Sequence, residues 1–279
     1  FKEISFGDLL RLQLDIETYC AEGYEFSNPY RDEDRITVIS LSDSDGWEYA
    51  ISGREYDEKE MLEIMVEQIN LRDPDVIEGH NIFNFDLTYI EARARRYKVP
   101  LAIGRNKQII KSHSSRLNIA ERTISYKKYE VYGRHIVDTY LLVQMYDVTA
   151  RNLESYGLKN VAKHFNVASP ERVYIKPEKI NWYYDNKPDE LLKYGMDDVR
   201  ETRAISEILS QSFYYQTRIF PYSFQNTVIR GNATKIDSLF IREYINSNHS
   251  IPRTPQAREY SGGYTDMFYQ GVVNRILYC

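Results

Sequence analysis

A strand with one apolar and one acidic face is predicted near the start of the chain, and it constrains the fold more than any other feature. Residues 11–18 alternate in character, with Leu12, Leu14 and Ile16 on one side and Gln13, Asp15 and Glu17 on the other. Successive side chains of a strand point to opposite faces, so the two acids lie about 6.6 Å apart on one face. The apolar face must be covered by other elements, which favours a layered protein built around a sheet.

The segments that follow alternate between strand and helix patterns. Two more strands are predicted at 35–41 and 47–52, joined by a turn-rich segment. Beyond them we predict a helix opened by the capping box at 57–60, a short buried strand at 76–77, a helix from Asp86, a strand at 134–138 and a helix at 139–147. The order β-β-β-α-β-α-β-α predicts an α/β fold with a mixed sheet covered by helices.

The rest of the chain is mainly helical. Residues 104–133 are polar and basic and are expected to form a hairpin or another ordered excursion from the domain. Helices are predicted at 153–165, 188–210, 213–219 and 227–246. We expect residues 1–210 to form the main domain, and residues 211–279 to form a helical segment and linker.

Composition narrows the class of protein. The 279 residues carry a net charge of −5, two cysteines (Cys20 and Cys279) and no apolar run near the ~18 residues of a membrane span. Neither a disulfide framework nor a zinc spacing is present, so an intracellular location is expected, in the cytoplasm or nucleoid, or in a nucleus. The 25 tyrosines offer stacking surface for unpaired bases, although most are expected to be half-buried structural residues.

Further acids occur on two predicted helices. Asp86 follows Asn81-Ile82-Phe83-Asn84-Phe85 and opens a helix, where an acid can also serve simply as a favourable helix start. Asp198 lies four residues after Tyr194, in an apolar stripe with Leu191 and Ile205. A buried carboxylate requires a partner, either a bound cation or, in the structural alternative, an arginine or backbone amides. Asp197 lies about 100° away around the helix and is expected to face solvent.

The four acids Asp15, Glu17, Asp86 and Asp198 together make an all-oxygen ligand set. Such sets suit Mg²⁺ or Mn²⁺ better than zinc. Two such ions about 3.5–4 Å apart are the usual device for in-line attack on a phosphodiester. We therefore predict a site for two divalent ions, and expect Asp15→Ala to abolish cleavage without unfolding the chain.

Four segments resemble motifs of family B DNA polymerases, in the order of that family. They are Leu14-Asp15-Ile16-Glu17-Thr18, Gly79-His80-Asn81-Ile82-Phe83-Asn84-Phe85-Asp86-Leu87, Tyr194-Gly195-Met196-Asp197-Asp198 and Tyr260-Ser261-Gly262-Gly263. The first three resemble the exonuclease motifs, and the fourth the segment between exonuclease and polymerase regions. The resemblance implies a ribonuclease-H-like fold with a five-stranded mixed sheet. It also implies a 3′→5′ proofreading exonuclease that releases nucleoside monophosphates from single-stranded DNA or a primer terminus.

The resemblance also implies roles for individual residues. Asp15 would bridge both ions, Glu17 and Asp198 would bind the ion that carries the attacking water, and Asp86 would hold the other. Tyr194 would hydrogen-bond the water. Asn81 and Phe85 would line the site near the terminal nucleotide. No palm motif follows before Cys279, so we expect no polymerase activity in this chain and a continuation into the polymerase domains of a parent protein.

The strand-binding residues and the function each have alternatives. Lys127 and Lys128, between Tyr126 and Tyr129, are predicted to contact DNA, whereas the cluster Arg93, Arg95, Arg96 and Lys98 is interpreted as solvated surface. One alternative is a catalytically silent module of the same fold that binds single-stranded DNA. Others are an exonuclease acting on RNA and, requiring several coincidences in order, a set of unrelated surface acids.

Overall fold

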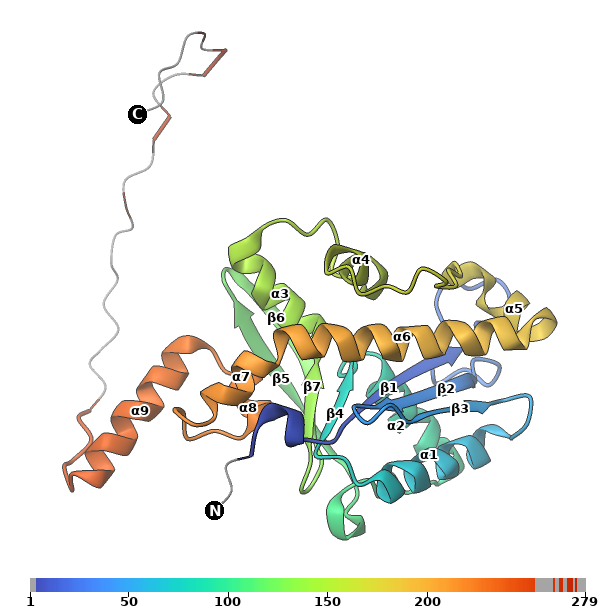
Figure 1. Ribbon diagram of the computed structural model, residues 1–279, viewed down its shortest axis with the longest axis horizontal. Coiled ribbons are helices and arrows are strands. Elements are labelled where there is room, and N and C mark those ends of the chain that lie inside the picture. Colours follow the sequence, from blue (N-terminus) through green and yellow to red (C-terminus); the bar gives the residue numbers. More distant parts are fainter. Residues whose placement is uncertain (1–3, 254–262, 264–265, 268–269, 273, 275–279) are drawn as a thin grey trace.

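A five-stranded mixed sheet forms the centre of the molecule, as the sequence predicted. The computed structural model describes residues 4–253, 263, 266–267, 270–272 and 274. The strand order is β3-β2-β1-β4-β7, in which β1 pairs antiparallel with β2 and parallel with β4 (Figure 1). The strands are β1 (Arg11–Thr18), β2 (Ile36–Asp43), β3 (Glu48–Ser52), β4 (Val76–Gly79) and β7 (His135–Asp138).

Helices cover both faces of this sheet. The apolar side of β1 packs into a core shared with α1 (Glu58–Arg72) and α2 (Asp86–Tyr97). On the opposite face the long helix α6 (Pro188–Leu209) crosses β1 and β2 (Figure 1). A Cβ at Gly195 would lie 2.5 Å from Ser40 Oγ of β2, so a larger residue here would force the Ser40 side chain to move. The remaining helices of this layer are α3 (Thr139–Ala150), α4 (Leu158–His164) and α5 (Ile180–Asn186).

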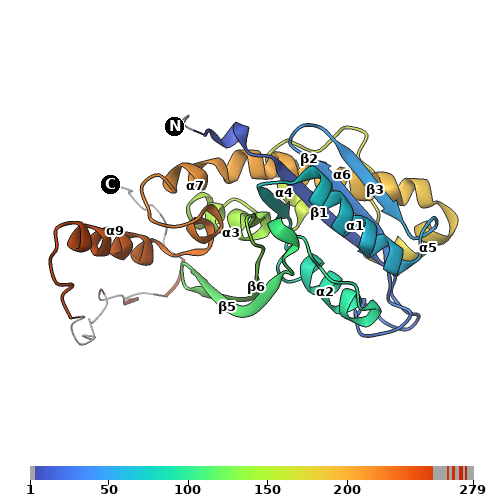
Figure 2. The same ribbon diagram turned by 90° about the horizontal axis from the view of Figure 1, so that it is seen from below.

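The polar excursion is a hairpin, as expected. Its strands β5 (Lys111–Ile119) and β6 (Arg122–Glu130) pair antiparallel and form a separate two-stranded sheet. Figure 2 shows the hairpin curving away from α2 toward the C-terminal helices. It turns at Ala120, which has a positive φ of 51°. We call residues 117–120 the hairpin tip.

The C-terminal helices differ in detail from the prediction. The structure has α7 (Gln211–Gln216), α8 (Phe224–Ile229) and α9 (Asn232–Asn246), so the single helix expected at 227–246 is broken before Asn232. The break follows from Gly231, which is extended and caps α9. Short 3₁₀ turns occur at Phe6–Asp8, Arg105–Lys107 and Pro177–Lys179.

Two further predictions concerned the segment at 260–263 and membrane-spanning helices. Of the predicted Tyr260-Ser261-Gly262-Gly263 segment, residues 260–262 lie outside the described residues, as does Cys279. Among the described residues no helix combines the length and apolar character that crossing a membrane requires.

Candidate active site

Three of the predicted acids meet between the sheet and α6. Asp15 and Glu17 project from β1 on the side opposite its apolar residues, and Asp198 reaches them from α6. Each offers a carboxylate oxygen within 4.8 Å of those of the other two. Asp198 is buried, with 3% of its surface exposed, as its place in the apolar stripe predicted.

Asp86 lies outside this group of three acids but is bonded to the same strand. It is the first residue of α2 and is 1% exposed. Its Oδ1 accepts a hydrogen bond of 3.1 Å from the amide of Ile16, the residue between Asp15 and Glu17. The carboxylate is therefore tied to β1, which a simple helix-start role would not require.

The electrostatics of this cluster favour bound protons or cations. Burial raises the pKa of Glu17 to about 8, and the neighbouring Asp198 contributes to this rise. Burial likewise raises the pKa of Asp86 to about 8, against the opposing effect of backbone hydrogen bonds. The pKa of Asp15 lies well above its ordinary value, because of burial first and then the charges of Asp198, Asp86 and Glu17. Fully ionised, this cluster needs positive charge.

The ligand atoms suit a divalent ion. Asp15 Oδ2 is buried and makes no hydrogen bond within the described part of the chain, so one lone-pair donor is left for another partner. All the donors are carboxylate oxygens, which Mg²⁺ and Mn²⁺ prefer. The residues therefore fit a divalent ion.

Two cationic side chains that sequence reasoning missed also bind Asp198. Lys159 Nζ lies 2.8 Å from Asp198 Oδ2, and Arg172 Nη2 donates to Asp198 Oδ1. The sequence left two possible partners for Asp198, a bound cation or an arginine. The structure shows the arginine, and it also shows Asp198 within the cluster of acids. Lys159 comes from α4 and Arg172 from the irregular segment before α5. No local motif marks either residue, because only the tertiary fold brings them to α6.

Asp197 does not face solvent, and that prediction is wrong. It is 3% exposed and accepts hydrogen bonds from the amide of Val173 (3.3 Å) and from Arg200 Nη1 (3.2 Å). Arg172 Nη1 is 3.6 Å from its Oδ2. The segment that carries Arg172 packs over this side of α6, so both sides of the helix are covered.

Tyr194 lies one helical turn before Asp198 and is 6% exposed. Lys159 Nζ lies 4.3 Å from the centre of its ring. Burial, followed by the charges of Asp198 and Glu17, raises the pKa of the phenol above its ordinary value. The hydroxyl therefore keeps its proton at neutral pH and can act as a hydrogen-bond donor.

The loop before α2 is held by a residue that the sequence did not single out. Asp138, at the end of β7, accepts hydrogen bonds from the amides of Asn81 (2.8 Å) and Phe83 (3.2 Å). This clamp holds Asn81 in a left-handed conformation, with φ of 69°. Phe85 is 37% exposed at the start of α2, and its ring lies 5.8 Å from that of Tyr89.

Lys127 and Lys128 point in different directions. Lys127 lines an open groove of about 810 Å³ between the hairpin and Asn84, and its ammonium pairs with Glu91 at 2.5 Å. Lys128 is 6% exposed and bonds Glu130 and Asn226 of α8. Lys128 does not line the groove.

The comparisons with known proteins agree with this geometry. The family described as DNA polymerase family B, exonuclease domain, matches residues 3–161. The chain is 26% identical over 265 residues to a DNA polymerase of Archaeoglobus fulgidus, and 25% identical over 289 residues to one of Thermococcus gorgonarius. These alignments cover 94% and 97% of the chain, but 31% and 35% of the two polymerases.

A solved structure gives the same result. The family B DNA polymerase of the hyperthermophilic archaeon Pyrobaculum calidifontis matches with a TM-score of 0.73 and 25% identity, over 91% of this chain and 31% of that one. The fold is consistent with the ribonuclease-H-like architecture that was expected. The chain spans about a third of the length of these relatives. It belongs to the family of exonuclease domains of family B DNA polymerases.

Proposed function

We propose that the chain is a 3′→5′ exonuclease that removes nucleoside monophosphates from the ends of single-stranded DNA, as the proofreading part of a family B polymerase. The observation that carries this proposal is the convergence of Asp15, Glu17 and Asp198 within 4.8 Å, with Asp86 tied to the same strand. We assign the activity to residues 1–210. Residues 211–279 would lead toward the polymerase domains of a longer protein.

Asp15, Glu17, Asp86 and Asp198 would hold two divalent ions, Mg²⁺ or Mn²⁺. When bound, these ions supply Lewis acidity that activates the attacking water and neutralises the departing 3′ oxygen. Tyr194 would donate its hydroxyl proton in a hydrogen bond that orients the attacking group. Lys159 lies against both Asp198 and the Tyr194 ring, so it would fix the relative position of these two side chains.

The strand would approach through the groove between Asn84 and the hairpin, where Lys127 and Arg116 supply positive charge. Asn81 and Phe85 would contact the terminal nucleotide. Stacking surface is available on the loop after β1, where Tyr24, Phe26 and Tyr30 are 60%, 76% and 78% exposed. Ser27 in this loop lies 2.8 Å from Thr18 at the end of β1, oxygen to oxygen, which joins the loop to the acidic strand.

A 5′-labelled single-stranded DNA incubated with Mg²⁺ tests the activity and its polarity. We expect a ladder that shortens from the 3′ end, and a loss on the order of 10³-fold in Asp15→Asn. Asp45→Asn is the matched control, because Asp45 lies in the exposed turn between β2 and β3. A ladder of equal intensity in Asp15→Asn contradicts the proposal, and faster digestion of a matched RNA strand contradicts its substrate.

The second candidate is a silent module that binds single-stranded DNA. The observation in its favour is that Lys159 and Arg172 occupy both oxygens of Asp198. A silent module would bind the labelled strand and leave it intact with either Mg²⁺ or Mn²⁺. Cleavage by the wild-type chain removes this candidate.

A further inference from the structure

A cleft lies under the hairpin tip, apart from the carboxylate site. Its walls come from the tip, α3, α7 and the start of α9, and its volume is about 370 Å³. Figure 2 shows the hairpin running toward this group of helices. We call this space the tip cleft.

All the charged residues that line the tip cleft are cationic. Its lining includes Lys235 and Arg230 and, among the described residues, no aspartate or glutamate. The chain as a whole has a net charge of −5, so a cleft with two cations and no acid runs against the general composition. Asn118, Thr149 and Asn232 add neutral hydrogen-bonding groups to its walls.

Lys235 is the unusual residue in this lining. It is 3% exposed, and its Nζ donates to Gln216 Oε1 at 2.9 Å. The rings of Phe213 and Phe220 lie 5.0 Å and 5.8 Å from Nζ, and no ion pair to a carboxylate is found in the part of the chain that the structure describes. A buried ammonium without a counter-ion is unfavourable, because burial removes the water that stabilises its charge. In agreement with this, burial lowers the pKa of Lys235.

The start of α9 adds to the positive potential. This 15-residue helix begins at Asn232, and its N-cap, Gly231, offers no side chain to the free amides of the first turn. Both residues line the tip cleft. Free amides at a helix N-terminus favour an anion, and here they lie beside the uncompensated Lys235.

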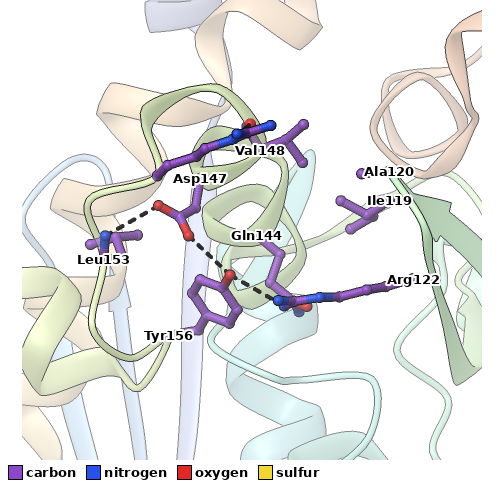
Figure 3. Close-up of a pocket in the computed structure, with 9 residues that line it drawn as sticks. Ile119, Ala120, Arg122, Gln144, Asp147, Val148, Leu153 and Tyr156 are labelled. Atoms are coloured by element: carbon purple, nitrogen blue, oxygen red, sulfur yellow. Dashed lines mark hydrogen bonds between the residues drawn. The ribbon is translucent and has the colours of Figure 1, made fainter. Parts of the chain in front are cut away.

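The pocket on the other side of the tip provides a contrast. Figure 3 shows Arg122 directed at the hydroxyl of Tyr156, with Nη1 3.4 Å from it, while that hydroxyl donates to Asp147 at 3.0 Å. Asp147 balances part of the positive charge of Arg122 and Arg151 in that pocket. The tip cleft has no such acid among the residues that line it, which makes it the better anion site of the two.

We propose that the tip cleft binds a phosphate group, held by Lys235, Arg230 and the first amides of α9. The phosphate belongs either to a polynucleotide backbone or to a free monoester such as a nucleoside monophosphate. A polynucleotide as the source of the phosphate rests on the proposed function. The same hairpin lines both the groove at Asn84 and the tip cleft, so one DNA strand could contact the two. The site itself rests only on the cleft and its charge.

Binding measured without catalysis separates this inference from the proposed function. All variants are made in the Asp15→Asn background with EDTA present, so neither cleavage nor metal-bound phosphate contributes. The probes are a fluorescent dT12 followed by anisotropy, and dTMP and inorganic phosphate followed by calorimetry. The variants are Lys235→Met, which keeps the volume of the buried chain, and Arg230→Gln, which is an exposed change. Lys59→Met on α1 is the control.

If the ligand is a strand, both cleft variants weaken dT12 binding about 5-fold or more relative to Lys59→Met. The slope of log K against log salt then falls by about 0.7 for each phosphate that the variant no longer neutralises. If the ligand is a free monoester, the variants fail to bind dTMP and phosphate while dT12 binding stays unchanged. Either result supports the site. Wild-type affinity for all three probes in both variants overturns it, whatever the outcome of the cleavage assay.

Discussion

Two buried clusters of charge in this molecule differ in how well they are balanced. At the first, Arg93 and Glu58 form a one-to-one pair with two hydrogen bonds between α1 and α2, and Arg93 also donates to the carbonyls of Pro29 and Arg31. The Ile36 amide donates to the same carboxylate at 2.9 Å. Each carboxylate oxygen and each guanidinium nitrogen there has a partner, so this cluster serves the structure.

The second cluster has more acids than cations. Of its four acids Asp15, Glu17, Asp86 and Asp198, only Asp198 pairs with the cations Lys159 and Arg172 in the described part of the chain. Arg172 also faces Asp197 and Glu201. Burial, together with the neighbouring negative charges, raises the pKa values of Asp15, Glu17 and Asp86. Asp15 Oδ2 has no hydrogen-bond partner among the described residues. The balanced Arg93–Glu58 pair leaves no charge for an outside partner. The second cluster has an excess of carboxylates, so it can bind an external cation.

Removing the arginine of the balanced pair should have the largest effect on stability. Arg93→Met leaves Glu58 buried without its partner, and we expect the free energy of unfolding to fall by about 3–5 kcal/mol. Urea unfolding with EDTA measures it. Arg93 lies about two helical turns after Asp86 on α2, and its carboxylate partner is Glu58 rather than one of the metal-binding acids. The additional stability conferred by Mn²⁺ should therefore be unchanged. Loss of that additional stability would show that the two clusters are not independent.

Removing the arginine of the unbalanced cluster should act in a different way. Arg172→Met removes a cation that competes for Asp198, so we expect Mn²⁺ to bind about 10-fold more tightly while the metal-free protein becomes less stable. Calorimetry gives the affinity, and unfolding with and without Mn²⁺ gives the stability. Weaker Mn²⁺ binding would instead assign Arg172 the task of holding Asp198 in position.

The pH dependence of stability in the absence of metal has a definite sign. The ordinary pKa values of a glutamate and an aspartate, 4.5 and 3.8, rise to about 8 for Glu17 and Asp86 in the folded chain. Between these values the folded chain binds more protons than the unfolded chain, so stability falls as pH rises from about 4 to 8 and levels off above. Unfolding in EDTA at several pH values measures this slope. A stability that rises with pH over this range, after allowance for other groups, contradicts the raised values.

The order of strands and helices could be predicted from sequence because each element carries its own local pattern. The alternation at Asp15 and Glu17 and the apolar stripe around Asp198 even indicated which way the acids point. Arg172 and Lys159 could not be found, because their contacts depend on segments 26 and 39 residues from Asp198 in the chain. Arg93 was hidden in a run of basic residues, where composition suggested surface but the fold buries one member completely.

Mn²⁺ binding to the wild-type chain tests the central claim most directly. In calorimetry at neutral pH we expect two ions per chain, with release of protons from the acids whose pKa values are raised. Asp15→Asn should abolish this binding, whereas Asp45→Asn should retain it. If the wild-type chain binds no Mn²⁺, or if Asp15→Asn binds two ions with unchanged affinity, the carboxylates are not a metal site and the proposed nuclease mechanism is wrong.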